Sequence, residues 1–252
     1  MKTAVISGGA GGLGRALGDA LRAEGWRVVA IDRDVSALAP DETLIALQCD
    51  LTDHAARDAV LAQLAQDYPR VDLAIYNAGI TQIGEFGALA EATHRRVFEV
   101  NYFAAVEMAR VLLPNLRAAK GTHLAISSVA GFAPLYRRVA YAASKHALEG
   151  AFKSLASEEA AHGVRVQIAA PSFVATNTGN PERSADGTAR PGSAPDGIDY
   201  MEPEAAARII LRGLARGAPF IPVGRVARAS WWINGVAPRL FRWLMERRIR
   251  GE

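Results

Sequence analysis

A tyrosine, a lysine and a serine near the middle of the sequence could together move a proton. Tyr141 and Lys145 stand four positions apart in a segment of helical periodicity, so both side chains project from one face of the predicted helix. Ser128 follows a short apolar run that predicts a strand. A phenol with the ordinary pKa of about 10 is a poor base at neutral pH, and a nearby ammonium group favours its phenolate. These residue types suit general acid–base chemistry on a substrate oxygen, although a Tyr–Lys pair at this spacing also occurs as a surface pair.

A glycine-rich turn joins the first predicted strand to the first predicted helix: Ser7-Gly8-Gly9-Ala10-Gly11-Gly12-Leu13-Gly14. Glycines let the backbone turn sharply and approach a pyrophosphate, and a helix N-terminus offers unpaired N–H groups to that anion. Taken alone, such a turn also fits an ordinary tight connection. In this context we expect a dinucleotide at the turn, with contacts from Ser7, Gly8, Gly12, Leu13 and Gly14.

Asp32 ends the second predicted strand, 18 positions beyond Gly14. A carboxylate there can accept both hydroxyls of an adenosine ribose, and its charge would repel a 2′-phosphate. Arg33 could pair with such a phosphate, but it could equally stack on the adenine or lie in solvent. Asp is also a common turn residue at the end of a strand. The sequence therefore favours NAD(H) over NADP(H) as the cofactor and leaves NADP(H) open.

The elements that must position these residues alternate along the chain, because short Val-, Ile- and Leu-rich runs are followed by longer segments of helical periodicity. The predicted strands are Thr3–Ser7, Arg27–Ile31, Thr43–Cys49, Val71–Tyr76, His123–Ser127 and Arg165–Ala170. The predicted helices are Gly12–Glu24, Asp53–Asp67 capped by Thr52, Glu91–Ala118, Tyr141–Ala161, and Glu204–Arg216 with Pro203 in its first turn. This pattern predicts an α/β fold, a single-domain doubly wound parallel sheet of Rossmann type over residues 1–252, with helices on both faces and a C-terminal helical extension.

An ordered set of motifs resembles that of the classical short-chain dehydrogenase/reductase family: Gly8-x-x-x-Gly12-x-Gly14, Asn77-Ala78-Gly79, Ser128 and Tyr141-x-x-x-Lys145. The likeness covers roughly residues 2–176. It implies an NAD(P)(H)-dependent oxidoreductase that interconverts a secondary alcohol and a ketone, with Tyr141 as general acid/base. It also implies that Lys145 holds the nicotinamide ribose and that Ser128 hydrogen-bonds the substrate oxygen. Asn101 matches a helix asparagine of the family, which implies a water-linked proton relay to the lysine.

The resemblance implies further cofactor contacts by position. These are Asp50 and Leu51 against the adenine, Asn77, Ala78 and Gly79 beside the adenosine ribose, Pro171, Val174 and Thr176 near the carboxamide, and Tyr141 and Lys145. Three positions depart from the family pattern, which usually has glycine at Ser172, a second asparagine at Tyr76 and threonine at Ser7. A serine can follow the turn at position 172 if its φ is negative, so the departure questions the local backbone shape more than the activity.

The composition is that of a globular protein, with 50% apolar and 22% charged residues and a formal net charge of +3. Cys49 is the only cysteine, so no disulfide can form within the chain, and we expect no metal site. We also expect no signal peptide, and no window has the roughly 18 uncharged apolar residues of a membrane span. A cytoplasmic location follows as the expectation.

Two later segments bear on the substrate. Residues 177–202 are rich in Gly, Pro, Ser and Asp and predict a substrate loop. Residues 225–252 hold seven Arg, two Glu and three of the four Trp, which predicts a basic amphipathic helical extension. Such an extension could lie peripherally on an anionic membrane, but we slightly prefer that it packs over its own substrate pocket or against another subunit. No basic face continues along the chain, so we expect no nucleic-acid binding.

The preferred hypothesis is thus an enzyme acting on a moderately hydrophobic carbonyl or alcohol. Assembly into a homodimer or homotetramer through Glu91–Ala118 and Tyr141–Ala161 is what the resemblance suggests. A dinucleotide-binding regulator or membrane-associated scaffold without turnover is the alternative, because fold alone does not fix function. A sugar epimerase or dehydratase is disfavoured by the glycine spacing and the short C-terminal portion.

Overall fold

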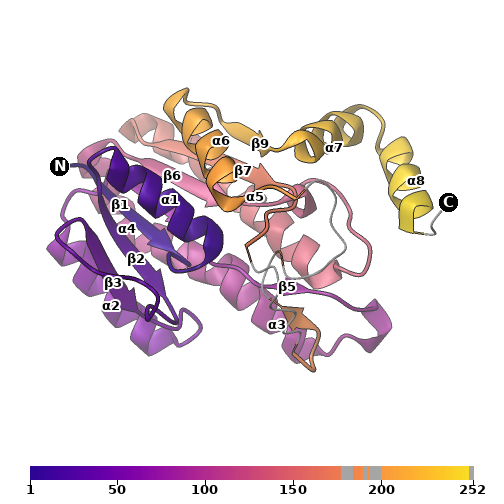
Figure 1. The fold of residues 1–252 in the computed structure, drawn as a ribbon, viewed down its shortest axis with the longest axis horizontal. Helices are drawn as coiled ribbons and strands as arrows, with labels where there is room; N and C mark the ends of the chain where they lie inside the picture. Colours follow the sequence, from indigo (N-terminus) through magenta and orange to yellow (C-terminus); the bar gives the residue numbers. More distant parts are fainter. Residues whose placement is uncertain (177–183, 190–191, 193–199, 250–252) are drawn as a thin grey trace.

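A seven-stranded parallel sheet forms the centre of the protein (Figure 1). The structure is a computed structural model that describes residues 1–176, 184–189, 192 and 200–249. Its strand order is β3-β2-β1-β4-β6-β7-β9. The strands are β1 (Thr3–Ser7), β2 (Arg27–Asp32), β3 (Leu44–Gln48), β4 (Leu73–Tyr76), β6 (Thr122–Ile126), β7 (Arg165–Pro171) and β9 (Phe220–Val223). The predicted α/β fold of Rossmann type is confirmed.

The strand order reverses at β1, which pairs with β2 on one side and with β4 on the other. Ser7, the last residue of β1, lies opposite Ile31 of β2 and Tyr76 of β4. Because the strands are parallel, the segments that follow them all leave the sheet at the same edge. Ligands of open α/β sheets bind in the crevice at such a reversal point.

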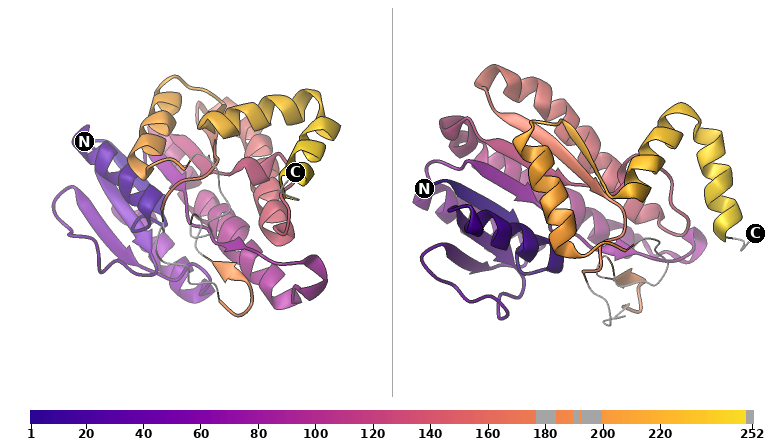
Figure 2. Two further views of the ribbon diagram at one scale, coloured as in Figure 1. Left: turned by 45° about the vertical axis from the view of Figure 1, so that its right-hand side comes forward. Right: turned by 45° about the horizontal axis from the view of Figure 1, so that its top comes forward.

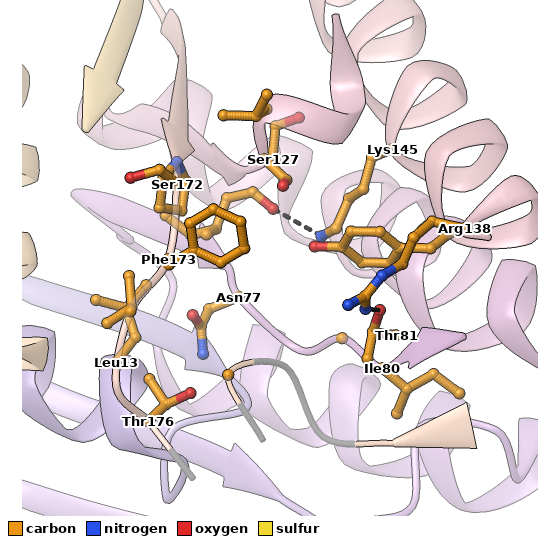
Figure 3. A pocket seen from close by; sticks show the side chains of 18 of the residues that line it. Leu13, Asn77, Ile80, Thr81, Ser127, Arg138, Lys145, Ser172, Phe173 and Thr176 are labelled. Carbon is orange, nitrogen blue, oxygen red and sulfur yellow. Dashed lines mark hydrogen bonds between the residues drawn. The ribbon is translucent and has the colours of Figure 1, made fainter. Parts of the chain in front are cut away.

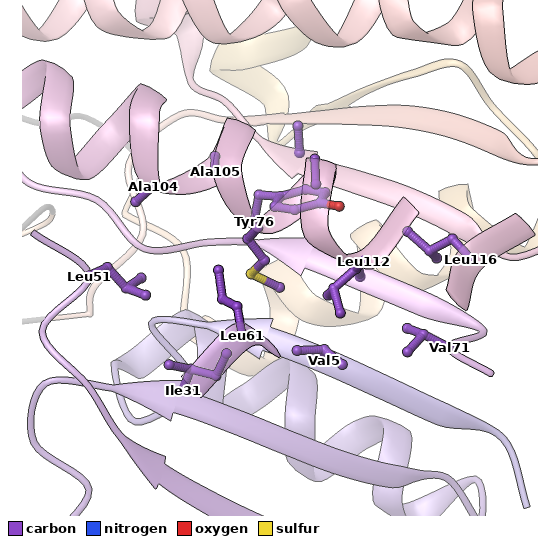
Figure 4. Packing of buried hydrophobic residues seen from close by; sticks show 14 of the residues in the cluster. Val5, Ile31, Leu51, Leu61, Val71, Tyr76, Ala104, Ala105, Leu112 and Leu116 are labelled. Atoms are coloured by element: carbon purple, nitrogen blue, oxygen red, sulfur yellow. The ribbon is translucent and has the colours of Figure 1, made fainter. Parts of the chain in front are cut away.

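Helices cover both faces of the sheet, and each contributes an apolar stripe to a core. Leu17 and Leu21 of α1 and Ile210 of α6 pack on one face. The other face is packed by α2, α4 and α5, which bury Leu61, Leu112 and Phe152. Figure 4 shows Leu61 and Leu112 in this core. These helices are α1 (Gly12–Ala23), α2 (His54–Asp67), α4 (Ala104–Ala119), α5 (Val139–Glu159) and α6 (Pro203–Ala215), and short 3-10 turns span Phe86–Ala88, Val129–Gly131 and Ala160–His162.

The long helix predicted at Glu91–Ala118 is interrupted. It consists of α3 (Glu91–Phe98), a π-helical turn at Glu99–Phe103 and then α4. A π-turn holds one more residue than an α-turn, which rotates the side chains that follow, and such turns often mark functional sites. Asn101 lies within this turn and is buried.

Smaller differences from the predicted elements have local causes. The cap of α2 is Asp53 rather than Thr52, because the Asp53 carboxylate accepts the Ala56 N–H at 3.1 Å. Three short strands were not predicted: β9 and the antiparallel pair β5 (Thr81–Gln82) and β8 (Thr188–Ala189). The predicted substrate loop at 177–202 lies largely outside the described residues.

The C-terminal extension forms two helices, α7 (Arg225–Val236) and α8 (Pro238–Ile249), instead of one. Figure 2 shows both helices at one end of the molecule, beyond the sheet. Ala227 and Phe241 pack against Val129 and Ala133 of the body, and Asn234 donates a 2.7 Å hydrogen bond to the Phe132 carbonyl. Among the helices formed by the described residues, none combines the length and the apolar character needed to cross a bilayer.

Candidate active site

A large cavity runs along the edge where β1, β2, β4, β6 and β7 end. Its volume is about 1430 Å³, above the roughly 300–1,000 Å³ of a typical small-ligand pocket. Most predicted site residues line it: Gly8, Gly12, Leu13, Asp32, Arg33, Asp50, Leu51, Asn77, Ala78, Gly79, Ser128, Tyr141, Lys145, Pro171, Val174 and Thr176. The remaining three, Ser7, Gly14 and Asn101, lie behind its wall.

The glycine turn has the shape that its sequence predicts. Gly8 has φ +66°, a conformation that L side chains rarely adopt. A methyl group on Gly14 would lie 2.0 Å from the Gly8 carbonyl oxygen, so only glycine lets α1 approach the turn. The first turn of α1 has no side-chain cap on its N–H groups. The turn and this helix end therefore fit a pyrophosphate, as expected for a dinucleotide.

Ser7 and Asn77 hold the turn against the end of β4. The Ser7 hydroxyl accepts the N–H groups of Asn77 and Ala78 at 3.1 and 3.2 Å. The Asn77 side-chain amide donates to the Gly8 carbonyl at 2.9 Å. Ser7 is buried, so it positions the residues that face the cavity.

Carboxylates gather at the end of the cavity near β2 and β3. The Asp32 carboxylate accepts the Ala10 N–H at 3.0 Å, which ties the end of β2 to the glycine turn. Ala10 also lines the cavity, although the spacing of the glycines around it does not mark it as a site residue. At Asp50, hydrogen bonds from the Thr52 backbone and hydroxyl hold the pKa of the carboxyl below its usual value. Thr52 therefore fixes the conformation of the segment that was predicted to lie against the adenine.

Ser128 and Tyr141 meet at the centre of the cavity. Burial raises the pKa of Tyr141, while a hydrogen bond with the Ser128 hydroxyl and the positive charge of Arg138 lower it. Arg138 is held in place by a 2.6 Å hydrogen bond from its Nη1 to the Thr81 hydroxyl (Figure 3). The charge that was expected to act on the phenol was that of Lys145. In the structure the positive charge that lowers the pKa of Tyr141 is that of Arg138, which the family motif does not contain.

Lys145 is buried in the cavity wall, one helical turn after Tyr141. Its Nζ donates to the Ile126 carbonyl at 2.8 Å (Figure 3). Burial lowers the pKa of Lys145 to about 8, and the negative charge of Glu149 opposes this shift. A methyl group on Gly79 would lie 3.6 Å from Nζ, so the lysine faces the predicted Asn77–Gly79 segment.

Asn101 connects the π-turn to the cavity wall. Its side chain accepts the Ile80 N–H at 2.8 Å and donates to the Ile80 carbonyl and the Ser144 hydroxyl, both at 2.9 Å. The extra residue of the π-turn aims this amide at Gly79–Ile80, opposite Lys145. The structure thus gives Asn101 a positioning contact. The water-linked relay stays a prediction.

Two of the three departures from the family pattern, Ser172 and Tyr76, are accommodated locally. The described non-glycine residues with positive φ are Lys120 and Arg137, so Ser172 keeps the negative φ that was required of it. Its N–H donates to the Val223 carbonyl at 3.2 Å. Tyr76 points into the core, where its hydroxyl lies 2.6 Å from His123 Nδ1. Neither position blocks the cavity.

The far end of the cavity is apolar, and sequence reasoning missed most of it. Its lining comes from the segments before α3 and α5 and from α7 and α8: Ile83, Leu135, Val226, Ile233, Phe241, Leu244 and Met245. The inner side of the extension therefore lines the chain's own pocket, which is one of the two placements that the preferred prediction named. Within the described ranges, no cluster of three or more His, Cys, Asp or Glu could hold a metal ion.

The crevice lies where the strand order reverses, and it contains a glycine turn, a buried lysine and a paired tyrosine and serine. These features together define a nucleotide-binding oxidoreductase of Rossmann type. The sequence model of the short chain dehydrogenase family matches residues 2–187. The chain belongs to this family and is a dehydrogenase/reductase.

Two of three similar proteins match nearly the whole chain, and the third matches about two thirds of it. Dehydrogenase/reductase SDR family member 7B of Bos taurus is 31% identical, over 98% of this chain and 81% of its own length. The crystal structure of a short-chain dehydrogenase from Streptomyces avermitilis has a TM-score of 0.82 at 30% identity and covers 100% of this chain and 99% of its own. A 4-hydroxyisoleucine dehydrogenase complexed with NADH has a TM-score of 0.66 at 29% identity, over 69% of this chain and 74% of its own.

Proposed function

We propose that this protein is an NAD(H)-dependent oxidoreductase that interconverts a secondary alcohol and a ketone, with Tyr141 as its general acid/base. The convergence of Ser128, Tyr141 and Lys145 on one cavity beside the glycine turn carries this proposal. A regulator that only binds dinucleotide would need neither the phenol–serine pair nor the buried amine.

Cofactor and substrate would occupy different ends of the cavity. Gly8, Gly12 and the start of α1 would hold the pyrophosphate, Asp32 the adenosine ribose and Lys145 the nicotinamide ribose. The bound nicotinamide supplies or accepts the hydride. The apolar end, lined by Ile233 and Phe241 among others, suits a moderately hydrophobic substrate.

The proton is handled by side chains of the chain itself. The Ser128 hydroxyl donates a hydrogen bond to the substrate oxygen and stabilises the charge that develops there. The Tyr141 hydroxyl gives its proton to this oxygen in reduction and takes it back in oxidation. The positive charge of Arg138 favours the phenolate that reduction leaves behind, and the family resemblance implies the same role for the Lys145 ammonium. Burial makes these charges effective because little water screens them.

A screen of ketones and secondary alcohols with NAD(H) tests the proposal. We expect turnover of at least one moderately apolar substrate, followed by the change in NADH absorbance. The panel should include water-soluble short-chain ketones and their longer homologues. Inactivity across the whole panel, with NADH binding intact, would favour the regulator instead.

The preference for NAD(H) depends on Asp32. We expect NADH to bind at least about tenfold more tightly than NADPH, because the Asp32 carboxylate would repel a 2′-phosphate. Asp32→Ser should weaken NADH binding and strengthen NADPH binding, as measured by fluorescence titration. Asp34→Ser is a matched control at the same end of the cavity. Tighter binding of NADPH by the wild-type protein would contradict the prediction and give the dominant role to Arg33.

We also propose that the chain is one domain, works in the cytoplasm and assembles as a homodimer or homotetramer. The sheet, which takes strands from residues 3–223, supports the single domain. The family resemblance supports assembly through α4 and α5.

A further inference from the structure

The helices α7 and α8 are apolar on two sides. Their inner side is buried against the body through Ala227 and Phe241. Their outer side leaves large apolar side chains in solvent, with Trp232 62% exposed, Val236 77% and Trp243 51%. A helix of a water-soluble protein normally has one apolar stripe and a polar opposite face. The outer side therefore has the composition of a surface that binds a partner or a membrane.

The exposed apolar residues of the protein are concentrated in these two helices. Half of the large hydrophobic residues that are exposed in the described parts of the chain lie in α7 and α8: Trp231, Trp232, Val236, Leu240, Trp243 and Leu244. Apolar side chains scattered singly over a protein need no explanation, whereas a contiguous group marks an interaction site. Both helices lie at the end of the molecule that extends beyond the sheet (Figure 2).

Exposed arginines accompany these apolar residues. In α7 and α8 they are Arg225, Arg228, Arg239, Arg242 and Arg247. Glu246 is the single acidic residue of the two helices, and it lies 4.0 Å from Arg242. The outer surface is thus strongly cationic as well as apolar, and its occupant must be anionic and apolar at once.

We propose that the outer surface of α7 and α8, defined by Trp232, Val236, Leu240 and Trp243 with Arg239 and Arg242, docks on an anionic lipid bilayer. Tryptophan prefers the boundary between headgroups and acyl chains, and arginine is attracted to anionic headgroups. A second copy of the chain fits less well, because a two-fold interface through this surface would bring two sets of arginines together. The helices lie on the bilayer, with their axes in the interface.

Docking here would bring the substrate cavity to the lipid. Ile233, Leu244 and Met245 of the same helices line the apolar end of the cavity. A ketone or alcohol dissolved in the bilayer could then reach the cavity without crossing bulk water. This consequence rests on the proposed function, whereas docking itself does not.

Flotation with vesicles tests the docking without any turnover. The full chain should float with vesicles of phosphatidylcholine and phosphatidylglycerol at low salt, and much less with phosphatidylcholine alone or at high salt. Trp232→Ser with Trp243→Ser, and separately Arg239→Gln with Arg242→Gln, should each lower the partition coefficient at least about tenfold. Phe86→Ser with Phe103→Ser is the matched control, because it removes exposed aromatic residues elsewhere and should change nothing.

Three results would overturn the proposal. They are no flotation with anionic vesicles, flotation that the α7 and α8 substitutions leave unchanged, and a dimer without lipid that the tryptophan substitutions convert to monomer in sedimentation equilibrium. Turnover of a water-soluble ketone, measured in parallel, separates the two proposals. Activity without flotation removes only the docking, and flotation without activity removes only the proposed reaction.

Discussion

Tyr141→Phe should lower kcat about 10²- to 10⁴-fold and leave the affinity for NADH nearly unchanged, because the variant loses the proton but keeps the ring. The phenol is buried and hydrogen-bonded with Ser128, so water cannot easily replace its proton. Steady-state kinetics with the best substrate of the screen, together with a fluorescence titration of NADH, measure both quantities.

A second tyrosine of the same cavity provides the control. Tyr136 lines the cavity but is 52% exposed, so Tyr136→Phe should leave kcat nearly intact. If Tyr141→Phe kept substantial activity while folding normally, another group would have to supply the proton, and the proposed mechanism would be wrong.

Lys145→Met should lower kcat/KM by at least about 10²-fold and, unlike Tyr141→Phe, should also weaken cofactor binding. The amine is expected to hold the nicotinamide ribose, and its Nζ is already fixed by the Ile126 carbonyl. Methionine has a similar length without the donor or the charge. Lys2→Met is the control, because Lys2 is exposed and lies over the Trp26 ring.

The same substitution should change how stability depends on pH. Burial lowers the pKa of Lys145 to about 8 in the folded protein, below its unfolded value of 10.5. Between these values the unfolded chain binds more protons, so this group makes stability rise with pH, by at most about 1.4 kcal/mol per pH unit. Below pH 8 both states are protonated, and the buried charge is a constant cost. Urea unfolding from pH 7 to 10 should show that the free energy of unfolding rises with pH in the wild type and lacks this contribution in Lys145→Met. If the free energy of unfolding had the same pH dependence in both proteins, the prediction would be wrong.

The parts that could be predicted from the sequence are those with strong local signals. β1 has the predicted bounds, because a short apolar run ends in glycines that no strand tolerates well. The glycine turn and the Tyr141–Lys145 pair needed no distant contacts to be recognised, since their spacing alone fixes their relative orientation. Thr43–Cys49 was two residues too long, as strand ends depend on pairing with β2.

The parts that could not be predicted depend on contacts between distant segments. The π-turn at Asn101 adds one residue to a helix, and the spacing of apolar residues along the sequence does not reveal this insertion. β9 is four residues long and contains Pro222. An edge strand tolerates a proline, but a proline in a short apolar run predicts that the run is not a strand. Arg138 acts on Tyr141 because Thr81, 57 residues away, holds its guanidinium group.

The walls of the cavity come from opposite ends of the chain. Residues up to Thr176 form the nucleotide side and also supply Ile83 and Leu135 to the substrate side, which Val226 to Met245 close from the other end of the chain. During synthesis the nucleotide crevice leaves the ribosomal exit tunnel first, and N-terminal segments can fold while the rest is still being made. A premature stop codon after Val223 would still encode every strand of the sheet. The product would be a nucleotide binder with one side open to water, able to compete for cofactor without selecting a substrate.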